Sequence, residues 1–534
     1  MDSYCLPVTR LPGTSQLLSA YIEDFSRVAA FYGHRPALES AHRAAEAVRL
    51  DAATRAGVVE VLRQQNENGA ADPSVARAID ELAAGAFAVV TGQQVGLLTG
   101  PAYTIYKALA CIALARQCSE RGLRAVPVFW MATEDHDLAE VSHVDWLSES
   151  GVTRLKLSEP ADMQGRSVGR VPIGSGGREV ADRVAALLAD RDEKLLAEIQ
   201  RAMQKQETFA SSFARLMAKV FAGHGLILLD PSAPQLHRLA APLFRDAIRK
   251  RAEVAQQLFA RGKQLERAGF HQQVKVTESS TPLFLEVEGR RTALRNRGDK
   301  LSAGSQSFSE QQLLQLAESA PERFSANALL RPVMQDSLLP TVAYVGGPAE
   351  IAYFAQSEVL YRAMLGRMPV VFPRASFTLV EPHAARMLGK YGLRAEDLFR
   401  GESWLRQTLE RKSLPRGLDA RFRKIEKDFA RQLQALQKQL TRLDRTLGAA
   451  SANSQEKILY QVAKLRDKAA RAHAFRSGVV DRHVRVLIDG IFPHKQPAER
   501  TLSFLPFLAR YGSSLLDTLE AKAGDIGCHH VVFL

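Results

Sequence analysis

Three polar segments of this sequence follow short apolar runs and contain the residue types that enzymes use for catalysis. In the densest segment, Glu134 to His143, six ionisable groups fall within ten residues. A histidine oriented by a carboxylate is the common base near neutral pH. The pattern therefore predicts that His136, with Asp135 or Glu134, is the base or the anchor of a substrate amine, and that His143 contributes to binding.

The same segment has two other interpretations. Its acids and histidines also resemble a metal-ligand set, which would make the protein a metal-dependent hydrolase. Their spacings match no zinc signature, so we expect no metal. The interpretation without a function is a solvated first turn of a helix, where acidic residues are favoured in any case.

A glycine-rich loop follows the apolar run 86–90 and precedes a helix that Pro101 opens. Glycines let backbone N–H groups approach a ligand, and the positive end of a helix favours a phosphate or carboxylate. The loop has neither a Walker A nor a GxGxxG pattern, and its alternative is a connection that binds nothing. We expect its glutamines and tyrosine to contact polar substrate groups and its lysine to hold an anionic one. The candidates are Thr91, Gly92, Gln93, Gln94, Gly100, Tyr103 and Lys107.

The third segment lies around the apolar run 341–345. Arg331 is suited to hold a carboxylate with two parallel hydrogen bonds. Glu350 falls in the first turn of a helix that Pro348 opens, where capping the helix is its alternative role. The residues predicted to bind substrate here are Asn327, Arg331, Gly347, Glu350 and Tyr353, with Arg374 as a weaker candidate.

The position of these segments depends on the elements that precede them. Short continuous apolar runs are typical of strands buried on both faces, and here they alternate with helical segments. This alternation predicts a doubly wound α/β core with a parallel sheet, with function in the loops at the carboxyl ends of the strands. The predicted strands are 86–90, 125–131, 225–230, 341–345 and 369–372, and the predicted helices include 101–121, 233–268 and 348–362.

We expect this core to span residues 1–392, beginning with helices over 14–84. Segments 152–174 and 282–296 alternate like antiparallel hairpins, which predicts inserted connecting segments at about 150–215 and 270–325. A last strand is expected at 528–534, within a segment 481–534 that returns to the core.

Residues 393–480 are predicted to form a long helical hairpin. Apolar residues follow heptad steps along 419–447, a turn is expected at 448–454, and the seam resumes over 458–472. A single hairpin exposes an edge of this seam, so we predict a coiled-coil homodimer. The seam residues of the first helix are Phe422, Ile425, Phe429, Leu433, Leu436, Leu440, Leu443 and Leu447.

Composition limits the class of protein. The chain has 534 residues, 46% hydrophobic and 24% charged, which is ordinary for a globular protein. No apolar run approaches the ~18 residues of a membrane span, and the N-terminus has no signal-like apolar region, so we expect a cytoplasmic protein. The net charge is +13, and residues 401–480 hold 18 basic and 8 acidic residues. The alternative to an enzyme is a basic coiled-coil scaffold that binds nucleic acid, although basic helix faces are usually only solvated.

The four cysteines do not suggest chemistry. None are in CxxC spacing, and four are too few for a disulfide scaffold. Cys111 and Cys118 lie on an apolar helix, where they are expected to be small core residues.

Four stretches together resemble a known family. TGQQVGLLTGPAYTIYKA, PVFWMATEDHDLAEVSHV, RPVMQDSLLPTVAYVGGPAEIAYFAQ and FPHKQPAERTLSFLPFLARYG are similar to the bacillithiol biosynthesis cysteine-adding enzymes, the BshC family of cysteine ligases. The resemblance covers essentially the whole chain. It implies a Rossmann-like core similar to class I aminoacyl-tRNA synthetases and nucleotidylyl transferases, and a coiled coil that forms a homodimer.

The resemblance also implies the last step of bacillithiol synthesis, in which cysteine is joined by an amide bond to the amino group of glucosaminyl malate. These small molecules are then the partners, rather than nucleic acid or a membrane. The sequence has no HxGH or KMSKS motif, so the route of carboxyl activation stays open, with ATP or a similar nucleotide as a candidate.

Amide formation needs a neutral amine and a stabilised oxyanion. The expected catalytic residues are His136, Glu134, Asp135 and Lys107, with Arg331 also holding an anionic group such as the malate moiety.

Overall fold

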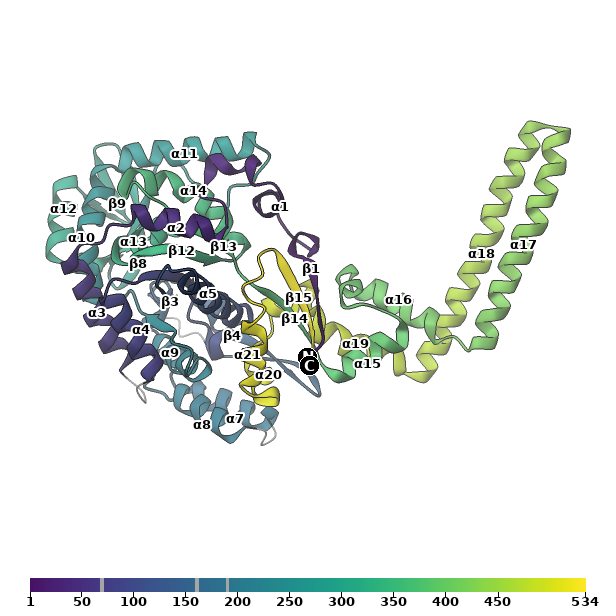
Figure 1. Cartoon of the computed structure of the whole chain (residues 1–534). Helices are drawn as coiled ribbons and strands as arrows, with labels where there is room; N and C mark the ends of the chain where they lie inside the picture. Colours follow the sequence, from purple (N-terminus) through teal and green to yellow (C-terminus); the bar gives the residue numbers. More distant parts are fainter. Residues whose placement is uncertain (68–71, 159–162, 189–191) are drawn as a thin grey trace. The chain divides into compact units, whose positions relative to one another are not determined.

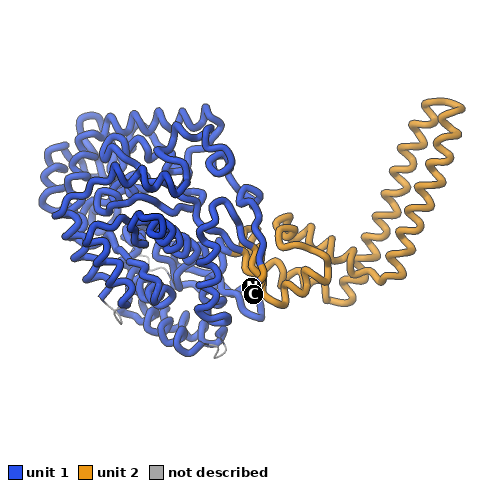
Figure 2. Tube along the Cα trace, viewed as in Figure 1, with its two compact units in different colours: residues 1, 3–377, 499–530 blue, residues 2, 378–498, 531–534 orange. Residues whose placement is uncertain are grey.

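The computed structural model describes residues 1–67, 72–158, 163–188 and 192–534. It divides into two compact units (Figure 2). The first contains residues 1, 3–377 and 499–530, and the second contains residues 2, 378–498 and 531–534. Among the described residues, none of the helices is both long and apolar enough to cross a membrane.

The first unit is built around the parallel sheet that the sequence predicts (Figure 1). Five strands, all parallel, have the spatial order β13-β12-β2-β3-β6. Most of their residues are buried, which explains why the sequence shows continuous apolar runs rather than alternation. The strands are β2 (Phe87–Gln93), β3 (Ala125–Met131), β6 (Ile227–Leu229), β12 (Thr341–Gly346) and β13 (Val370–Pro373).

The order of the strands reverses between β2 and β12. From β2 the chain proceeds to β3 and β6 on one side, whereas β12 and β13 lie on the other. In open parallel sheets the crevice for ligands forms outside the carboxyl ends of the strands at such a switch point. The glycine-rich loop after β2 and the helix after β12 both begin there.

The helices of this unit follow the prediction with one correction. The predicted helix 233–268 is two helices, α10 (Pro234–Arg249) and α11 (Arg251–Arg267), because the backbone leaves helical geometry at Lys250. α5 (Tyr103–Glu120) packs on β2 and β3 and is buried almost all round, so it lacks a polar face. The others in the core are α1 (Gln16–Glu23), α2 (Leu38–Ala47), α3 (Ala52–Asn66), α4 (Pro73–Ala83), α13 (Arg331–Leu338) and α14 (Pro348–Met364).

The inserted segments form antiparallel sheets and helices. The larger sheet has the order β10-β9-β8-β7-β11, and its β7 (Ser280–Val287) and β8 (Arg290–Arg297) are the hairpin predicted at 282–296. The first hairpin lies at β4 (His143–Ser148) and β5 (Gly151–Lys156), earlier than the predicted 152–174; residues 159–162 of that prediction lie outside the described residues. The remaining elements here are α6 (Leu138–Val141), α7 (Gly176–Leu188), α8 (Glu193–Ala202), α9 (Phe209–Val220), β9 (Lys300–Ala303), β10 (Gln306–Phe308), α12 (Glu310–Ser319) and β11 (Phe324–Ala326).

The last part of the chain adds a third sheet, with the order β1-β15-β14. β15 is the strand predicted at the end of the sequence. Cys5 of β1 and Cys528 of β15 form a disulfide, a pairing across 523 residues that their spacing could not suggest. The elements are β1 (Ser3–Pro7), β14 (Ser376–Val380), α20 (Leu505–Tyr511), α21 (Ser514–Glu520) and β15 (Cys528–Phe533).

The second unit begins at residue 378, earlier than the hairpin domain expected from 393. The unit extends beyond the predicted hairpin domain at both ends, because α15 (Pro382–Tyr391) and α16 (Glu402–Ser413) pack against α19 (Val479–Ile491), beside the base of the hairpin. The hairpin itself consists of α17 (Arg416–Leu443) and α18 (Arg445–Ser477), which pack along each other.

The turn of the hairpin lies at Asp444, not at the predicted 448–454. Asp444 caps α18 by accepting a hydrogen bond from the backbone N–H of Thr446 at 2.5 Å. Gly448 is inside α18, where a Cβ would lie 2.3 Å from Oγ1 of Thr441 on α17. This glycine therefore allows the two helices to approach closely and is not a turn residue.

The predicted seam separates into two stripes. Phe422, Leu433 and Leu440 are half-buried, whereas no residue of α17 is fully buried. A second stripe remains more than one-third exposed in the single chain. It consists of Leu418, Ile425, Phe429, Leu436 and Leu443 of α17 and Leu447, Ile458, Tyr460, Leu465 and Phe475 of α18.

The two free cysteines are packing residues of α5. Cys111 is fully buried, with its Sγ 3.1 Å from the carbonyl oxygen of Val89. Burial raises the pKa of the Cys118 thiol to about 11.

We expect Cys111→Ala and Cys118→Ala each to lower the free energy of unfolding by about 1–2 kcal/mol through lost packing, measured by denaturant titration. Turnover should stay within twofold of wild type, and a folded Cys118→Ala protein without activity would contradict this.

Candidate functional site

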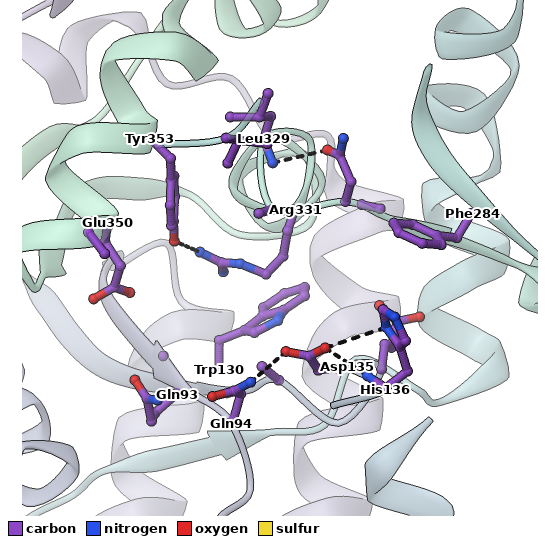
Figure 3. Close-up of a pocket in the computed structure, with 18 of the residues that line it drawn as sticks. Gln93, Gln94, Trp130, Asp135, His136, Phe284, Leu329, Arg331, Glu350 and Tyr353 are labelled. Carbon is purple, nitrogen blue, oxygen red and sulfur yellow. Dashed lines mark hydrogen bonds and ion pairs between the residues drawn. The ribbon is translucent and has the colours of Figure 1, made fainter. Parts of the chain in front are cut away.

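A cavity of about 610 Å³ lies at the switch point of the core sheet (Figure 3). Its walls come from the loops after β2, β3 and β12 and from the inserted strands β7, β8 and β11. Thirteen predicted site residues line it: Gly92, Gln93, Gln94, Tyr103, Lys107, Glu134, Asp135, His136, Asn327, Arg331, Gly347, Glu350 and Tyr353. The structure thus brings the three predicted segments into one site.

Thr91, Gly100 and His143 do not line this cavity. Thr91 is buried, and its hydroxyl donates to the carbonyl of Val345 at 2.8 Å, which joins β2 to β12. Nδ1 of His143 lies 3.1 Å from the carbonyl oxygen of Ala139. Within the glycine-rich loop, only Gly92 to Gln94 reach the cavity, so the rest of the loop acts as a connector.

The start of α5 does not present a free anion site. The backbone N–H of Ala102 donates to the carbonyl of Leu502 at 2.7 Å, so a neighbouring segment occupies this end of the helix. Gly100 has φ +68° and ψ −160°, a conformation essentially limited to glycine. The conformation of Gly100 accounts for a glycine at this position without a ligand, and its predicted role in ligand binding stays a prediction.

Lys107 joins both sides of the switch point. Its ammonium donates to the carbonyl of Gly92 at 2.7 Å and to Oε1 of Gln93 at 2.9 Å, and it forms an ion pair with Glu350. The side chain is 4% exposed, and burial lowers the pKa of Lys107 although Glu350 opposes this. An ammonium has three donors, and these three contacts use them. Lys107 therefore positions the floor of the cavity.

Glu350 caps α14, and Asn327 holds the turn before α13, while both line the cavity. Oε2 of Glu350 accepts from the backbone N–H of Gly347 at 2.6 Å. Oδ1 of Asn327 accepts from the N–H groups of Leu329 and Leu330, both at 3.0 Å. The capping interpretation of Glu350 is therefore confirmed, beside its ion pair with Lys107.

Arg331 is held by neutral groups. Its Nη2 donates to the hydroxyls of Tyr353 at 2.8 Å and Tyr344 at 3.2 Å, and its Nη1 donates to Oε1 of Gln335 at 3.2 Å. Figure 3 shows the guanidinium beside Tyr353, toward the centre of the cavity. Among the described residues no carboxylate forms an ion pair with it, so its charge is available to an anionic ligand.

Asp135 and His136 form a hydrogen-bonded corner of the cavity. Asp135 accepts from Nε2 of Gln94 at 2.7 Å and from the backbone N–H of His136 at 2.7 Å. Nη1 of Arg291 lies 3.1 Å from Nδ1 of His136. Arginine only donates, so Nδ1 is the acceptor and the imidazole proton is on Nε2. His136 then offers an N–H donor to the cavity in this arrangement.

Sequence reasoning missed Arg291, His237 and Glu499. Arg291 packs over the ring of Phe284 and donates to the carbonyl of Ala326 at 2.7 Å. Arg291, Ala293 and Arg295 occupy alternate positions of β8 and line the cavity. The alternation in the sequence predicts a hairpin, but it does not show that this strand covers a cavity. Glu499 binds the guanidinium of Arg374 at 2.6 and 3.1 Å, both side chains being buried.

His237 holds the third acid of the cluster. Its Nε2 lies 2.9 Å from Oε1 of Glu134, and its side chain is 1% exposed. It sits in the first turn of α10, far from the 134–143 segment in the sequence, and no motif surrounds it.

The cavity lining has more positive than negative charge. Seven cations face four carboxylates, and Lys107 and Arg374 are paired with Glu350 and Glu499. An anionic ligand would balance the remainder. The cations are Lys107, Lys275, Arg291, Arg295, Arg331, Arg374 and Arg500, and the carboxylates are Glu134, Asp135, Glu140 and Glu350.

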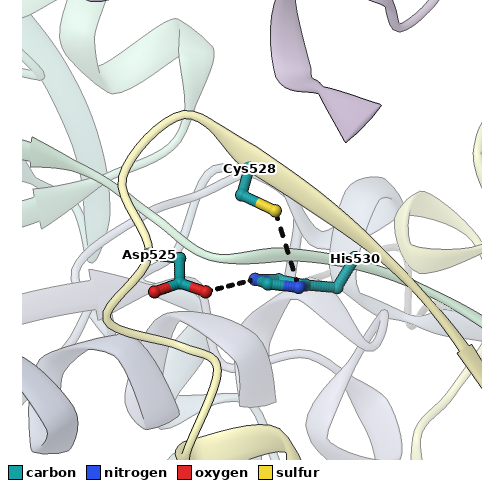
Figure 4. Close-up of side chains that lie close together, drawn as sticks. All are labelled: Asp525, Cys528 and His530. Carbon is teal, nitrogen blue, oxygen red and sulfur yellow. Dashed lines mark hydrogen bonds and ion pairs between the residues drawn. The ribbon is translucent and has the colours of Figure 1, made fainter. Parts of the chain in front are cut away.

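A separate group of metal-ligand residue types lies outside the cavity (Figure 4). Among the described residues it consists of Asp525, Cys528 and His530. Nδ1 of His530 is 3.5 Å from Sγ of Cys528, and Nε2 is 3.4 Å from Oδ2 of Asp525. Because Cys528 is in the disulfide with Cys5, its sulfur is not a thiolate ligand here.

Comparison with known proteins identifies the family. The model of the "Bacillithiol biosynthesis BshC, N-terminal Rossmann-like domain" matches residues 1–375, and that of the C-terminal coiled-coil domain matches residues 377–534. The chain belongs to the BshC family. The division at 375 and 377 agrees with the start of the second compact unit at 378, whereas residues 499–530 belong to the first unit in the structure. The match to a Rossmann-like domain agrees with the sheet order.

Relatives resemble the chain over its whole length. The protein of Koribacter versatilis, named "Putative cysteine ligase BshC", is 39% identical over 99% of both chains. Relatives of the same name in Solibacter usitatus and Symbiobacterium thermophilum are each 37% identical, over 98% and 99% of this chain and 99% and 100% of their own. The BshC assignment supports an enzyme rather than a nucleic-acid-binding scaffold.

The backbone of the glycine-rich loop generates a prediction about stability. Gly100→Ala forces a Cβ into a conformation that costs about 1–3 kcal/mol, although its neighbours leave room at 3.7 Å. We expect a lower midpoint of thermal unfolding with an unchanged KM for each substrate. As a control, Gly389→Ala, where nothing lies near the added Cβ, should not lower the midpoint. An intact midpoint with weakened substrate binding would instead favour a ligand-binding role for Gly100.

Proposed function

We propose that this protein is the cysteine ligase that completes bacillithiol synthesis, by forming the amide bond between cysteine and the amino group of glucosaminyl malate. The observation that supports this most is the cavity at the switch point. It combines unpaired cations for an anionic substrate with a carboxylate–histidine pair for an amine. The names of the full-length relatives support the same ligase activity.

The two chemical needs of the reaction correspond to two parts of the cavity. Arg331, between Tyr344 and Tyr353, is suited to hold a carboxylate of the malate moiety. Glu134 and Asp135, at the end of β3, are suited to hold the ammonium group of the amine and to remove its proton. His136 and Arg291 would donate hydrogen bonds to the carbonyl oxygen as negative charge develops there.

Activation of the cysteine carboxylate is assigned to a nucleotide such as ATP. We propose that the core is related to class I aminoacyl-tRNA synthetases and nucleotidylyl transferases, which supports adenylate chemistry. The strand order and the position of the cavity are compatible with this relation. The sequence lacks HxGH and KMSKS, so the groups that hold the nucleotide would differ from those motifs.

The activity is tested with the purified protein. Incubation with cysteine, glucosaminyl malate and ATP should yield bacillithiol, identified by mass spectrometry, and deletion of the gene should make glucosaminyl malate accumulate in a source organism that makes this thiol. Arg331→Gln should raise KM for glucosaminyl malate by about 10- to 100-fold, the value of a charge-assisted hydrogen bond. Arg238→Gln, at an exposed position outside the cavity, is the matched control. No product from the folded wild-type protein with any nucleoside triphosphate would exclude the proposed function.

We propose that the protein acts in the cytoplasm as a homodimer joined through α17 and α18. The exposed residues of α17 follow heptad steps, and α18 adds further exposed apolar residues, so a second copy would cover the stripe by coiled-coil packing. The basic side chains of the segment 401–480 would then lie beside the seam and face solvent.

The exposed stripe predicts which substitutions separate the dimer into single chains. Leu436 and Leu443 are 47% and 78% exposed in the single chain, so replacing both with Asp removes apolar contacts without disturbing the hairpin. Light scattering should show a dimer for wild type and a mass near 58.8 kDa for the double variant. Gln434→Asp with Gln439→Asp, at exposed polar positions of α17, should remain dimeric. A monomeric wild-type protein at micromolar concentration would refute the homodimer.

A further inference from the structure

A buried histidine outside the predicted motifs contacts the acid that faces the amine. His237 in α10 places Nε2 2.9 Å from Oε1 of Glu134 and Nδ1 3.2 Å from the carbonyl oxygen of Ala233. Its side chain is 1% exposed and that of Glu134 is 13% exposed. Both ring nitrogens of His237 therefore lie against oxygen atoms in a site that water scarcely reaches.

These contacts determine how many protons the pair holds. A carbonyl and an ionised carboxylate only accept hydrogen bonds. Each ring nitrogen therefore needs a proton, unless Glu134 is itself protonated. Imidazole is the stronger base of the two, so the favoured state is an imidazolium paired with a carboxylate. Burial alone lowers the pKa of His237, but the hydrogen bond and charge of Glu134 outweigh it and raise the pKa above its ordinary value.

The charged groups around the pair favour the same state. Arg291 and Asp135 lie on the cavity side, where Arg291 interacts with both acids. The charge of Arg170 opposes protonation of His237, but Arg170 is paired with Glu286 at 3.2 Å. Two cations, the His237 imidazolium and the Arg291 guanidinium, therefore lie close to the Glu134 carboxylate.

Glu134 also lies between two cavities. It lines the substrate cavity and a second, polar cavity of about 20 Å³, lined also by Ser167, Ser232 and Arg170. That volume has room for one water molecule. In the described parts of the chain, Oε2 of Glu134 accepts no hydrogen bond, whereas Oε1 is held by His237. One oxygen is thus fixed and the other is available.

His136 is less suited to remove a proton. Its Nδ1 accepts from Arg291 at 3.1 Å, and its other nitrogen then carries the proton. Its position in the cavity suits a donor. Both oxygens of Asp135 accept hydrogen bonds, from Gln94 and from the backbone of His136, which leaves Oε2 of Glu134 as the available acceptor.

We propose that His237 is the positioning residue that holds Oε1 of Glu134 and places a positive charge beside it, so that Oε2 of Glu134 removes a proton from the ammonium group of the amine substrate. This inference rests on the proposed ligase function. In the step one N–H bond breaks, its electron pair stays on nitrogen, and an O–H bond forms on Glu134, while His237 keeps both of its protons. The total charge is unchanged. Loss of the proton from Glu134 to solvent restores the carboxylate for the next turnover.

The protonation of His237 can be tested without any substrate. In protein labelled with ¹³C at histidine Cε1, we expect one signal to keep the imidazolium shift up to about pH 8, above the unperturbed range. This signal should disappear in His237→Gln and change to neutral imidazole in Glu134→Gln. A neutral His237 at pH 7 in the folded wild-type protein would overturn the proposal, whether or not the variants fold.

The catalytic role is tested by kinetics. Glutamine at position 237 can still donate to Glu134, but it carries no positive charge to balance the carboxylate. We expect the acid limb of the pH–rate profile to move upward by about one unit or more. We also expect kcat/KM for glucosaminyl malate to fall about 10- to 100-fold, with KM for cysteine unchanged. Adding His237→Gln to Glu134→Gln should cause no further loss, since both act through one group.

A second, partly buried histidine–glutamate pair supplies the control. His224 lies 2.8 Å from Glu520 outside the cavity, so His224→Gln breaks the same kind of contact. It should leave the pH–rate profile unchanged. If wild type ligates cysteine and the profile of His237→Gln equals that of wild type, the role of His237 is refuted while the ligase function stands. If wild type makes no product, the proposed function fails, and the NMR result still decides the state of the pair.

Discussion

A buried lysine ammonium connects the two parts of the sheet at the point where their order reverses. Lys107 contacts the end of β2 through Gly92 and Gln93, and the start of α14 through Glu350. A buried charge is costly unless a partner and further hydrogen bonds compensate it. The three acceptors meet that requirement only if the loops after β2 and β12 keep their present separation. The shape of the cavity therefore depends on this interaction.

The same constraint explains the network around it. Glu350 compensates Lys107, caps α14 and accepts from the hydroxyl of Tyr344 at 2.5 Å. Tyr344 in turn receives a hydrogen bond from Arg331, which has no carboxylate partner of its own among the described residues. In this network Glu350 and the tyrosine hydroxyls all have hydrogen-bond partners. The positive charge of Arg331 remains for a ligand. His237 holds Glu134, another residue of the cavity lining, in a similar way.

Much of the fold could be predicted because parallel strands buried on both faces need continuous apolar runs. All five core strands appear in the sequence for that reason, and polar loops at their carboxyl ends predicted thirteen residues of the cavity lining. The prediction was weaker where glycine served more than one purpose. Gly448 suggested a turn, yet it lies inside α18 where the two hairpin helices approach most closely. A glycine in a sequence does not show whether it supplies a conformation or removes a side chain.

The sequence by itself determined which loops follow buried strands, because hydrophobic period and glycine position are local properties. It also carried enough of the motifs to indicate the family. The tertiary structure alone decided which side chains complete the site. His237, Arg291 and Glu499 reach Glu134, His136 and Arg374 from segments 103, 155 and 125 residues away. It also decided the direction of the hydrogen bonds, since Arg291 donates to Nδ1 of His136 and Nε2 of His237 contacts Oε1 of Glu134. These partners come from distant segments, so their contacts cannot be read from one short stretch of the chain.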